Sequence, residues 1–345
     1  MPTEAEPLLE LTDLVAGYRL RAGIGRPGGE VRAVAGVSLT VREGETVGLV
    51  GESGCGKSTI ARTIVGLVRP SSGKVLFEGR DLAALPAKEL RRLRREIQLV
   101  FQDPYAALNP RMTVAALIKE AWRIHQGLVP RERWDEEVRA LLSRVGLRPE
   151  YADRYPHQFS GGQRQRISIA RALAVRPRLI VCDEAVSALD VSVRAQILNL
   201  LQELQRDLGV AYLFISHDLG VVRHLCDRVA VMYLGKVVET GSKERIYRSP
   251  AHPYTQALLS AAPSLDDWRE GGRGEIVLTG DVPSPLNPPT GCRFRTRCWR
   301  AEDRCRDEEP ALIDRNTGHP VACHFPGAVP TPTTTEADSG HLVKE

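Results

Sequence analysis

A short glycine-rich segment has residue types and spacing that suit the binding of phosphate groups. It consists of Gly51, Glu52, Ser53, Gly54, Cys55, Gly56, Lys57, Ser58 and Thr59. Its glycines allow backbone N–H groups to turn inward around phosphate oxygens, and the start of a following helix adds partial positive charge. Lys57 is expected to reach the β- and γ-phosphates of a nucleotide, and the Ser58 hydroxyl is expected to bind Mg²⁺. The segment therefore predicts a nucleotide-binding site.

Two acidic residues and a histidine follow predicted strands. Asp183 and Glu184 come directly after the apolar run 179–182, and His217 follows the apolar run 210–215 by two positions. Asp183 suits a place beside Mg²⁺, and Glu184 is positioned to polarise the water that attacks a γ-phosphate. His217 is predicted to contact the γ-phosphate. Such residues at strand ends are often only solvated or structural, but the phosphate-binding loop favours the catalytic interpretation.

A second segment also has the chemistry of an anion site. Ser160 is a good helix N-cap, and the glycines that follow it leave the N–H groups of the helix start uncovered. The segment continues as Gly161, Gly162 and Gln163. Because the phosphate-binding loop already surrounds the phosphates of its own nucleotide, this second surface predicts a dimer in which each partner closes the other's site.

Four of the seven cysteines lie close together near the C-terminus. Cys292, Cys298, Cys305 and Cys323 are separated by five, six and seventeen residues. Structural zinc sites usually pair cysteines about two to four residues apart, so zinc is the poorer interpretation. Four thiolates on loops are adequate for a [4Fe–4S] cluster, and neighbouring arginines are expected to lower the thiol pKa values. Ordinary cysteines, with or without a zinc ion, are the alternative.

The elements that must position these residues are those of an α/β domain. Strand-like runs alternate with helical patterns from about residue 8 to 249, and buried parallel strands are expected at 45–50, 179–182 and 210–215. In open parallel sheets ligands bind at the carboxyl ends of the strands, where the polar residues stand. Residues from about 86 to 160 are charged and leucine-rich, which predicts a helical insert with helices at 88–95, 112–125 and 131–145.

The chain is expected to divide into three parts. Residues 1–249 form the nucleotide-binding domain, 250–326 form a small extension with the four cysteines and a helix at 254–262, and 327–345 form a disordered tail. The net charge of +4 is too small to predict nucleic-acid binding. Because residues 1–10 lack the basic start of a secretory signal and no apolar run reaches about 18 residues, we expect a cytosolic protein that acts at a membrane through partners.

Taken in order along the chain, the motifs resemble those of the ATP-binding subunits of ABC transporters. Gln102 lies in the position of the glutamine loop, Ser160 begins the signature motif, and Asp190 ends the loop that follows Glu184. The resemblance implies a P-loop ABC ATPase fold that hydrolyses ATP with Mg²⁺. It assigns Gln102 to Mg²⁺, the attacking water and the coupling to a membrane subunit, and Ser160 to Gln163 to the ATP of the opposite subunit.

The same resemblance assigns two more residues. Asp190 would link the two ATP sites across the dimer. Tyr18 would stack on adenine, with a plain core tyrosine as the alternative.

Three further stretches resemble ATPases of oligopeptide and dipeptide importers, in particular the second of the two ATPase subunits. These stretches are residues 155–159, 185–192 and 250–258. The resemblance implies two permease subunits, a related ATPase subunit as dimer partner, an extracytoplasmic solute-binding protein, and a peripheral place on the cytoplasmic face of the plasma membrane. It also implies an iron–sulfur cluster in the extension. Nickel, glutathione and oligosaccharide importers share this ATPase type, so the solute stays open.

Two other classes of protein are less consistent with the sequence. An ABC ATPase that works on DNA or ribosomes predicts a long coiled coil or tandem cassettes, but this chain has one phosphate-binding loop and no long heptad run. An iron–sulfur redox protein that also binds ATP would not need every nucleotide motif in family order.

Overall fold

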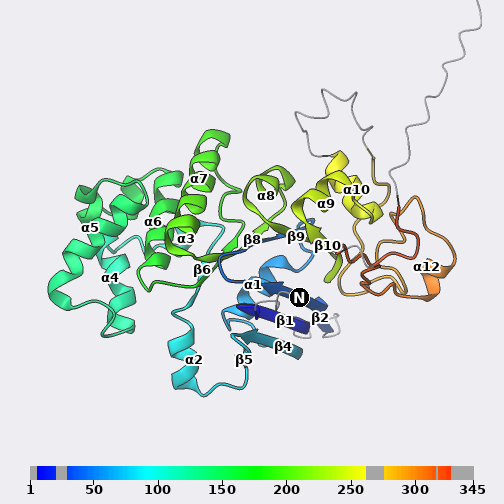
Figure 1. The fold of residues 1–345 in the computed structure, drawn as a ribbon, viewed down its shortest axis with the longest axis horizontal. Coiled ribbons are helices and arrows are strands. Elements are labelled where there is room, and N and C mark those ends of the chain that lie inside the picture. Colours follow the sequence, from blue (N-terminus) through cyan, green and yellow to red (C-terminus); the bar gives the residue numbers. More distant parts are fainter. Residues whose placement is uncertain (1–5, 21–28, 262–275, 316–317, 328–345) are drawn as a thin grey trace, which may run out of the picture.

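The computed structural model describes residues 6–20, 29–261, 276–315 and 318–327 (Figure 1). Its larger sheet has the strand order β10–β9–β3–β8–β7–β6. All neighbouring strands in it are parallel except for β10, which runs antiparallel to β9. Its strands are β3 (Thr46–Val50), β6 (Ile97–Val100), β7 (Leu179–Asp183), β8 (Ala211–Ser216), β9 (Arg228–Tyr233) and β10 (Lys236–Ser242).

A smaller antiparallel sheet has the order β2–β1–β4–β5. Its strands are β1 (Leu9–Leu20), β2 (Gly29–Val41), β4 (Ser72–Phe77) and β5 (Arg80–Asp81). The helices are α1 (Lys57–Ile64), α2 (Ala87–Leu93), α3 (Pro104–Ala107), α4 (Val114–Ile124), α5 (Trp134–Arg144), α6 (Gly161–Leu173), α7 (Val191–Leu208), α8 (Leu219–Leu225), α9 (Lys243–Arg248), α10 (Pro253–Ser260) and α12 (Arg304–Asp307). Short 3₁₀ turns lie at η1 (Arg131–Arg133), η2 (Pro149–Asp153) and η3 (Pro156–Gln158).

The larger sheet separates two hydrophobic cores. Side chains alternate across a strand, so Leu179 and Val181 of β7 enter one core while Ile180 and Cys182 enter the other. The first core contains α1 and the smaller sheet, and the second contains α4 to α8. Both faces of β3, β7 and β8 are buried, as the continuous apolar runs predict.

The α/β prediction and the three buried strands are confirmed, each within one residue of its expected start. The predicted insert at 86–160 is wrong in one respect, because residues 97–100 form β6, which pairs in parallel with β7. Ile97 and Val100 are buried in opposite cores, and this pairing extends the sheet by one strand. The part of the insert that contains helices and no strand therefore begins only at Pro104.

The C-terminal part of the described chain contains little regular structure and joins the free edge of β10. The N–H of Ala322 donates to the Val238 carbonyl at 2.8 Å, and that of Thr240 donates to the Pro320 carbonyl at 3.0 Å. Gly327, which the prediction assigned to the tail, is held by Ala251 and Gln256. The remaining residues of the predicted tail, 328–345, lie outside the described residues.

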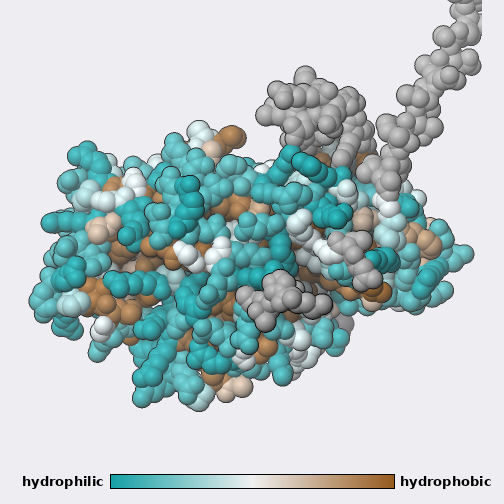
Figure 2. All heavy atoms as spheres, in the orientation of Figure 1, coloured by the Kyte–Doolittle hydropathy of each residue, from teal (hydrophilic) through white to brown (hydrophobic). Residues whose placement is uncertain are grey.

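The surface is mostly hydrophilic on the face drawn in Figure 2, with small hydrophobic areas between. Among the helices that the structure describes, none combines the length and the apolar character needed to span a bilayer.

Candidate functional site

The phosphate-binding loop connects β3 to α1 and depends on two glycines with positive φ. Gly51 has φ 155° and Gly56 has φ 109°. A Cβ atom at Gly51 would lie 2.1 Å from the Met232 carbonyl oxygen, and one at Gly56 would lie 2.1 Å from that of Ala33. Side chains fit neither position, so glycine is required for the loop to pack against β2 and β9.

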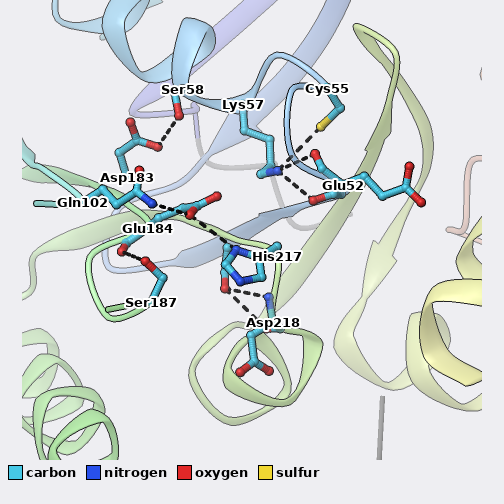
Figure 3. A network of polar contacts seen from close by, with 12 residues as sticks. Glu52, Cys55, Lys57, Ser58, Gln102, Asp183, Glu184, Ser187, His217 and Asp218 are labelled. Atoms are coloured by element: carbon cyan, nitrogen blue, oxygen red, sulfur yellow. Dashed lines mark hydrogen bonds and ion pairs between the residues drawn. The ribbon is translucent and has the colours of Figure 1, made fainter. Parts of the chain in front are cut away.

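Lys57 places a buried positive charge inside this loop. Its side chain donates to the carbonyl oxygens of Gly51 at 2.7 Å and of Glu52 at 2.9 Å (Figure 3). Lys57 is 4% exposed, and it is the first residue of α1. An ammonium group beside a helix start is a site for an anion. Burial raises the pKa of the neighbouring Cys55 thiol, which is consistent with a small packing residue.

Oxygen ligands suited to Mg²⁺ stand at the same edge of the sheet. The Ser58 hydroxyl donates to Asp183 Oδ1 at 2.9 Å (Figure 3). Asp183 ends β7 and is 5% exposed, and burial raises its pKa although the Ser58 hydrogen bond opposes the shift. Hydroxyl and carboxylate oxygens are ligands that Mg²⁺ prefers. These two residues could hold the cation of a bound nucleotide.

The Glu184 carboxylate is held by residues that follow two other strands. Gln102, after β6, donates to Glu184 Oε2 at 3.0 Å, and His217 Nδ1, after β8, lies 3.4 Å from the same oxygen (Figure 3). Glu184 has φ 49°, a conformation uncommon outside glycine, and its N–H donates to the Ile215 carbonyl at 3.0 Å. The structure thus brings the three predicted catalytic residues together around one carboxylate oxygen.

Two residues that the motifs did not single out support this network. Asp218 caps α8 by accepting the N–H of Gly220 at 2.9 Å, and it accepts a hydrogen bond from Arg194 of α7 at 2.7 Å. The cap fixes the residue next to His217 and ties the His217 loop to α7. An aspartate directly before an apolar helix is a signal that the sequence offered.

The signature segment forms a second helix start. The Ser160 hydroxyl accepts the N–H of Gln163 at 3.4 Å, and the Gln163 side chain accepts the N–H of Ser160 at 3.1 Å. This capping box begins α6, in which the Cβ of a residue at Gly162 would lie 2.3 Å from Val193 Cγ1. The buried side chains of α6 and α1 lie in different cores. The structure therefore places Ser160, Gly161, Gly162 and Gln163 on the opposite face of the sheet from α1.

Two other predicted site residues are exposed. Asp190 stands before α7 without capping it, and the next residue, Val191, is 80% exposed. The Tyr18 hydroxyl lies 3.4 Å from the Thr59 hydroxyl, and the Tyr18 side chain is 40% exposed. Tyr18 thus stands at the edge of the phosphate-binding loop, with a ring that solvent can reach.

The four C-terminal cysteines are free thiols. The N–H of Cys292 donates to the Cys305 carbonyl at 2.9 Å. The expected lowering of the thiol pKa values is wrong for Cys292 and Cys298, because burial raises the pKa of each to about 11. Within the described ranges, no group of three or more histidine, cysteine, aspartate or glutamate side chains is arranged to hold a metal ion. The thiol donors suit iron–sulfur chemistry, but their arrangement does not confirm a cluster.

Comparison with known proteins identifies the family. Residues 34–187 match the ABC transporter family, and residues 238–305 match the C-terminal region of oligopeptide/dipeptide transporters. The oligopeptide transport ATP-binding protein AppF of Bacillus subtilis is 53% identical over 322 residues, which cover 93% of this chain and 98% of AppF. The chain belongs to the ATP-binding subunits of oligopeptide/dipeptide ABC transporters.

Other relatives agree with this membership. OppF of Salmonella typhimurium is 50% identical over 92% of this chain and 95% of its own length. A post-hydrolysis dimer of the ATP-binding cassette MJ0796, bound to ADP and Pi, is 30% identical with a TM-score of 0.60, over 68% of this chain and 98% of that chain. The chain is accordingly an ATPase with the P-loop ABC fold.

Proposed function

We propose that this ATPase powers the import of dipeptides or oligopeptides through permease subunits of a bacterial membrane. The observation that carries the proposal is the Glu184 carboxylate, held by Gln102 and His217 beside the Ser58–Asp183 pair. The second family match, at residues 238–305, and relatives named for oligopeptide and dipeptide transport support the class of solute.

In this proposal each site residue has a distinct role in hydrolysis. Lys57 and the loop N–H groups bind the phosphates, and Ser58 and Asp183 hold Mg²⁺. Glu184 takes the proton of the attacking water, while Gln102 and His217 orient that water and the γ-phosphate. Tyr18, exposed beside Thr59, stacks on the adenine.

A dimer completes the site. Because α6 and α1 pack in different cores, Ser160 cannot reach the nucleotide of its own loop without crossing the sheet. The start of α6 therefore serves the ATP of a partner, which we propose to be a related ATPase subunit. Asp190 and the exposed Val191 lie on the segment that would face this partner.

The permease is proposed to dock beside Gln102. A cavity of about 290 Å³ lies there, lined in part by Leu67, Phe101 and Arg171. Leu67 is 65% exposed and Phe101 is 41% exposed, so the rim presents apolar surface next to a catalytic residue. Leu67→Asp should reduce co-purification with the permease. Val277→Asp is the matched control, since Val277 is 74% exposed on the C-terminal extension.

The decisive experiment measures ATP hydrolysis by the complete membrane complex, reconstituted with a solute-binding protein. Stimulation by the peptide-loaded binding protein is the expected result and supports a peptide importer. If peptide gives no stimulation while basal hydrolysis persists, peptide as the solute is contradicted. The same assay with nickel, glutathione or an oligosaccharide then distinguishes the alternative solutes.

Three finer proposals concern the rest of the chain. We propose that residues 1–249 are the nucleotide-binding domain, that 250–326 are the transporter-type extension, and that the protein works at the cytoplasmic face of the plasma membrane. The [4Fe–4S] cluster on Cys292, Cys298, Cys305 and Cys323 stays a prediction. Iron and sulfide analysis with the absorption spectrum of anaerobically purified protein tests it, and stoichiometric zinc without iron would contradict it.

A further inference from the structure

The C-terminal extension contacts the phosphate-binding loop directly. The Tyr254 hydroxyl, on α10, accepts the N–H of Glu52 at 2.8 Å. Arg297 donates to both carboxylate oxygens of Glu52, at 3.0 and 2.8 Å. One residue of the loop is thus held at its backbone and at its side chain by residues more than 200 positions away.

These contacts are shielded from solvent. The Arg297 side chain is 9% exposed and that of Glu52 is 25% exposed, so their attraction is screened less than that of a surface pair. Burial opposes the charge of Arg297, yet the hydrogen bonds and charges around it, chiefly those of Glu52, raise its pKa. The Arg297 guanidinium is therefore a charged donor held against the Glu52 carboxylate.

An aromatic cluster fixes the position of both contacts. The Tyr254 ring lies 4.7 Å from that of Tyr233 and 5.4 Å from that of Phe294. Phe294 is 1% exposed and stands three positions before Arg297, in the loop between Cys292 and Cys298. How this cysteine-flanked loop is seated thus determines where the guanidinium group lies.

The Glu52–Arg297 pair also affects the electrostatics of the phosphate-binding loop. Glu52 carries a negative charge in a loop that must accept a triphosphate, and like charges repel at short range. In the structure the Glu52 side chain points away from Lys57 (Figure 3), toward Arg297, which neutralises it. Without Arg297 the carboxylate would be free to turn toward the phosphates or to pair with Lys57.

We propose that Arg297 and Tyr254 are positioning residues that hold the phosphate-binding loop in the shape that accepts ATP, so that nucleotide affinity depends on the seating of the loop between Cys292 and Cys298. The extension thereby controls ATP binding in its own subunit. This inference depends on the ATP site and is independent of which solute is transported.

Arg297→Gln is the first test, with nucleotide affinity and steady-state hydrolysis measured on the intact protein. Loss of a charged hydrogen-bonded partner predicts a Kd and a KM for ATP on the order of tenfold higher. The effect falls on KM rather than kcat, because the catalytic carboxylate is untouched. Arg304→Gln is the matched control, since Arg304 is an exposed arginine of the same extension that pairs with Glu308 at 2.7 Å.

A double-mutant cycle distinguishes positioning from a general structural role. In a Glu52→Gln background the charge that needs neutralising is gone, so Arg297→Gln should change the Kd by less than about twofold. Equal effects of Arg297→Gln in both backgrounds would overturn the proposal. So would an unchanged Kd in Arg297→Gln alone.

Tyr254→Phe provides a variant that keeps the aromatic cluster intact. It removes only the hydroxyl that accepts the Glu52 N–H, and we expect ATP affinity to weaken by about threefold to tenfold. Cys298→Ala then tests the link to the cysteines. It should raise the Kd in the wild-type background and have no further effect in Arg297→Gln, whereas an additive effect would contradict transmission through Arg297.

Discussion

The nucleotide edge of the sheet and the C-terminal extension are built on different physical principles. At the nucleotide edge, the fully buried strands β7 and β8 end in polar residues and β3 leads into the phosphate-binding loop, so the parallel sheet brings Ser58, Asp183 and His217 to one edge. In the extension, α12 has only four residues, and aromatic packing and arginine side chains maintain the structure. A substitution in the first region should therefore reduce ATP hydrolysis, whereas a substitution in the second should disturb the conformation of the extension.

The two regions contact each other at Glu52. Glu52 belongs to the phosphate-binding loop, but its partners Tyr254 and Arg297 belong to the C-terminal extension. A change in the less regular region can thus reach the ATP site without altering any catalytic residue.

The largest effect is expected from Glu184→Gln, at the nucleotide edge of the sheet. Hydrolysis should fall by about 10²- to 10⁴-fold because the general base is lost, while ATP still binds and traps the closed dimer. Turnover and gel filtration with MgATP measure the two outcomes. Glu203→Gln, an exposed glutamate of α7, is the control. Normal turnover in Glu184→Gln would remove Glu184 from its role.

Phe294→Ala tests how far the C-terminal extension depends on side-chain packing. Phe294 is 1% exposed within the aromatic cluster, so its truncation should cost about 3–5 kcal/mol of the stability of the extension. Limited proteolysis should release the extension first, with the sheet still folded. Trp299→Ala, at a side chain that is 38% exposed in the same segment, should have little effect. Simultaneous loss of the sheet in Phe294→Ala would show that the two regions unfold as one unit.

The pH dependence of stability should also differ between the regions. Burial lowers the pKa of His252 from 6.5 to about 4, although Glu239 and a backbone hydrogen bond at Ala322 oppose the shift. A lowered histidine pKa means that its stabilising contribution is complete above pH 6.5 and is lost as the pH falls toward 4. The loss amounts to about 3 kcal/mol at the acid end.

His252→Asn isolates this contribution. Asparagine can still accept the N–H of Tyr254, which His252 Nδ1 accepts at 3.0 Å, but it does not titrate. Melting temperatures between pH 7 and 4.5 should fall less steeply in the variant. His319, whose Nε2 lies 2.7 Å from Glu239 Oε1, is present in both proteins, and the exposed His224→Asn should leave the slope unchanged. Equal slopes for wild type and His252→Asn would contradict the assignment.

The smallest effect is expected at Gly54, in the phosphate-binding loop. Gly54 has φ 80°, but a Cβ there would meet nothing within 4 Å. Gly54→Ala should therefore reduce the stability of the loop only by the strain of an alanine in the left-handed conformation, about 1–2 kcal/mol, and should retain ATP binding. Gly56→Ala adds the clash with the Ala33 carbonyl and should abolish binding. Equal ATP binding by the two variants would show that the positive φ angle, and not the room for a Cβ atom, determines the requirement for glycine.

Much of the nucleotide site followed from the sequence because its residues lie at the ends of buried strands. Period, apolar runs and motif spacing are local properties, and parallel strands bring their carboxyl ends to one edge without further information. This is why Asp183, Glu184 and His217 could be grouped beforehand, whereas Gln102 was assigned only through the resemblance to the family. The pairing of residues 97–100 with β7 was not predicted. This strand has only four residues, one of them polar, and such a short run cannot be distinguished from the surrounding helical sequence by its pattern.

The sequence by itself determined the family, the order of the motifs and the chemistry proposed for each nucleotide contact, because these reside in residue types at short spacing. Only the tertiary structure decided what the C-terminal extension touches. The contacts of Glu52 with Tyr254 and Arg297 join positions separated by 202 and 245 residues, and no local pattern encodes such a pairing. Burial, likewise a property of the folded chain, raises the cysteine pKa values where neighbouring arginines alone predicted the reverse.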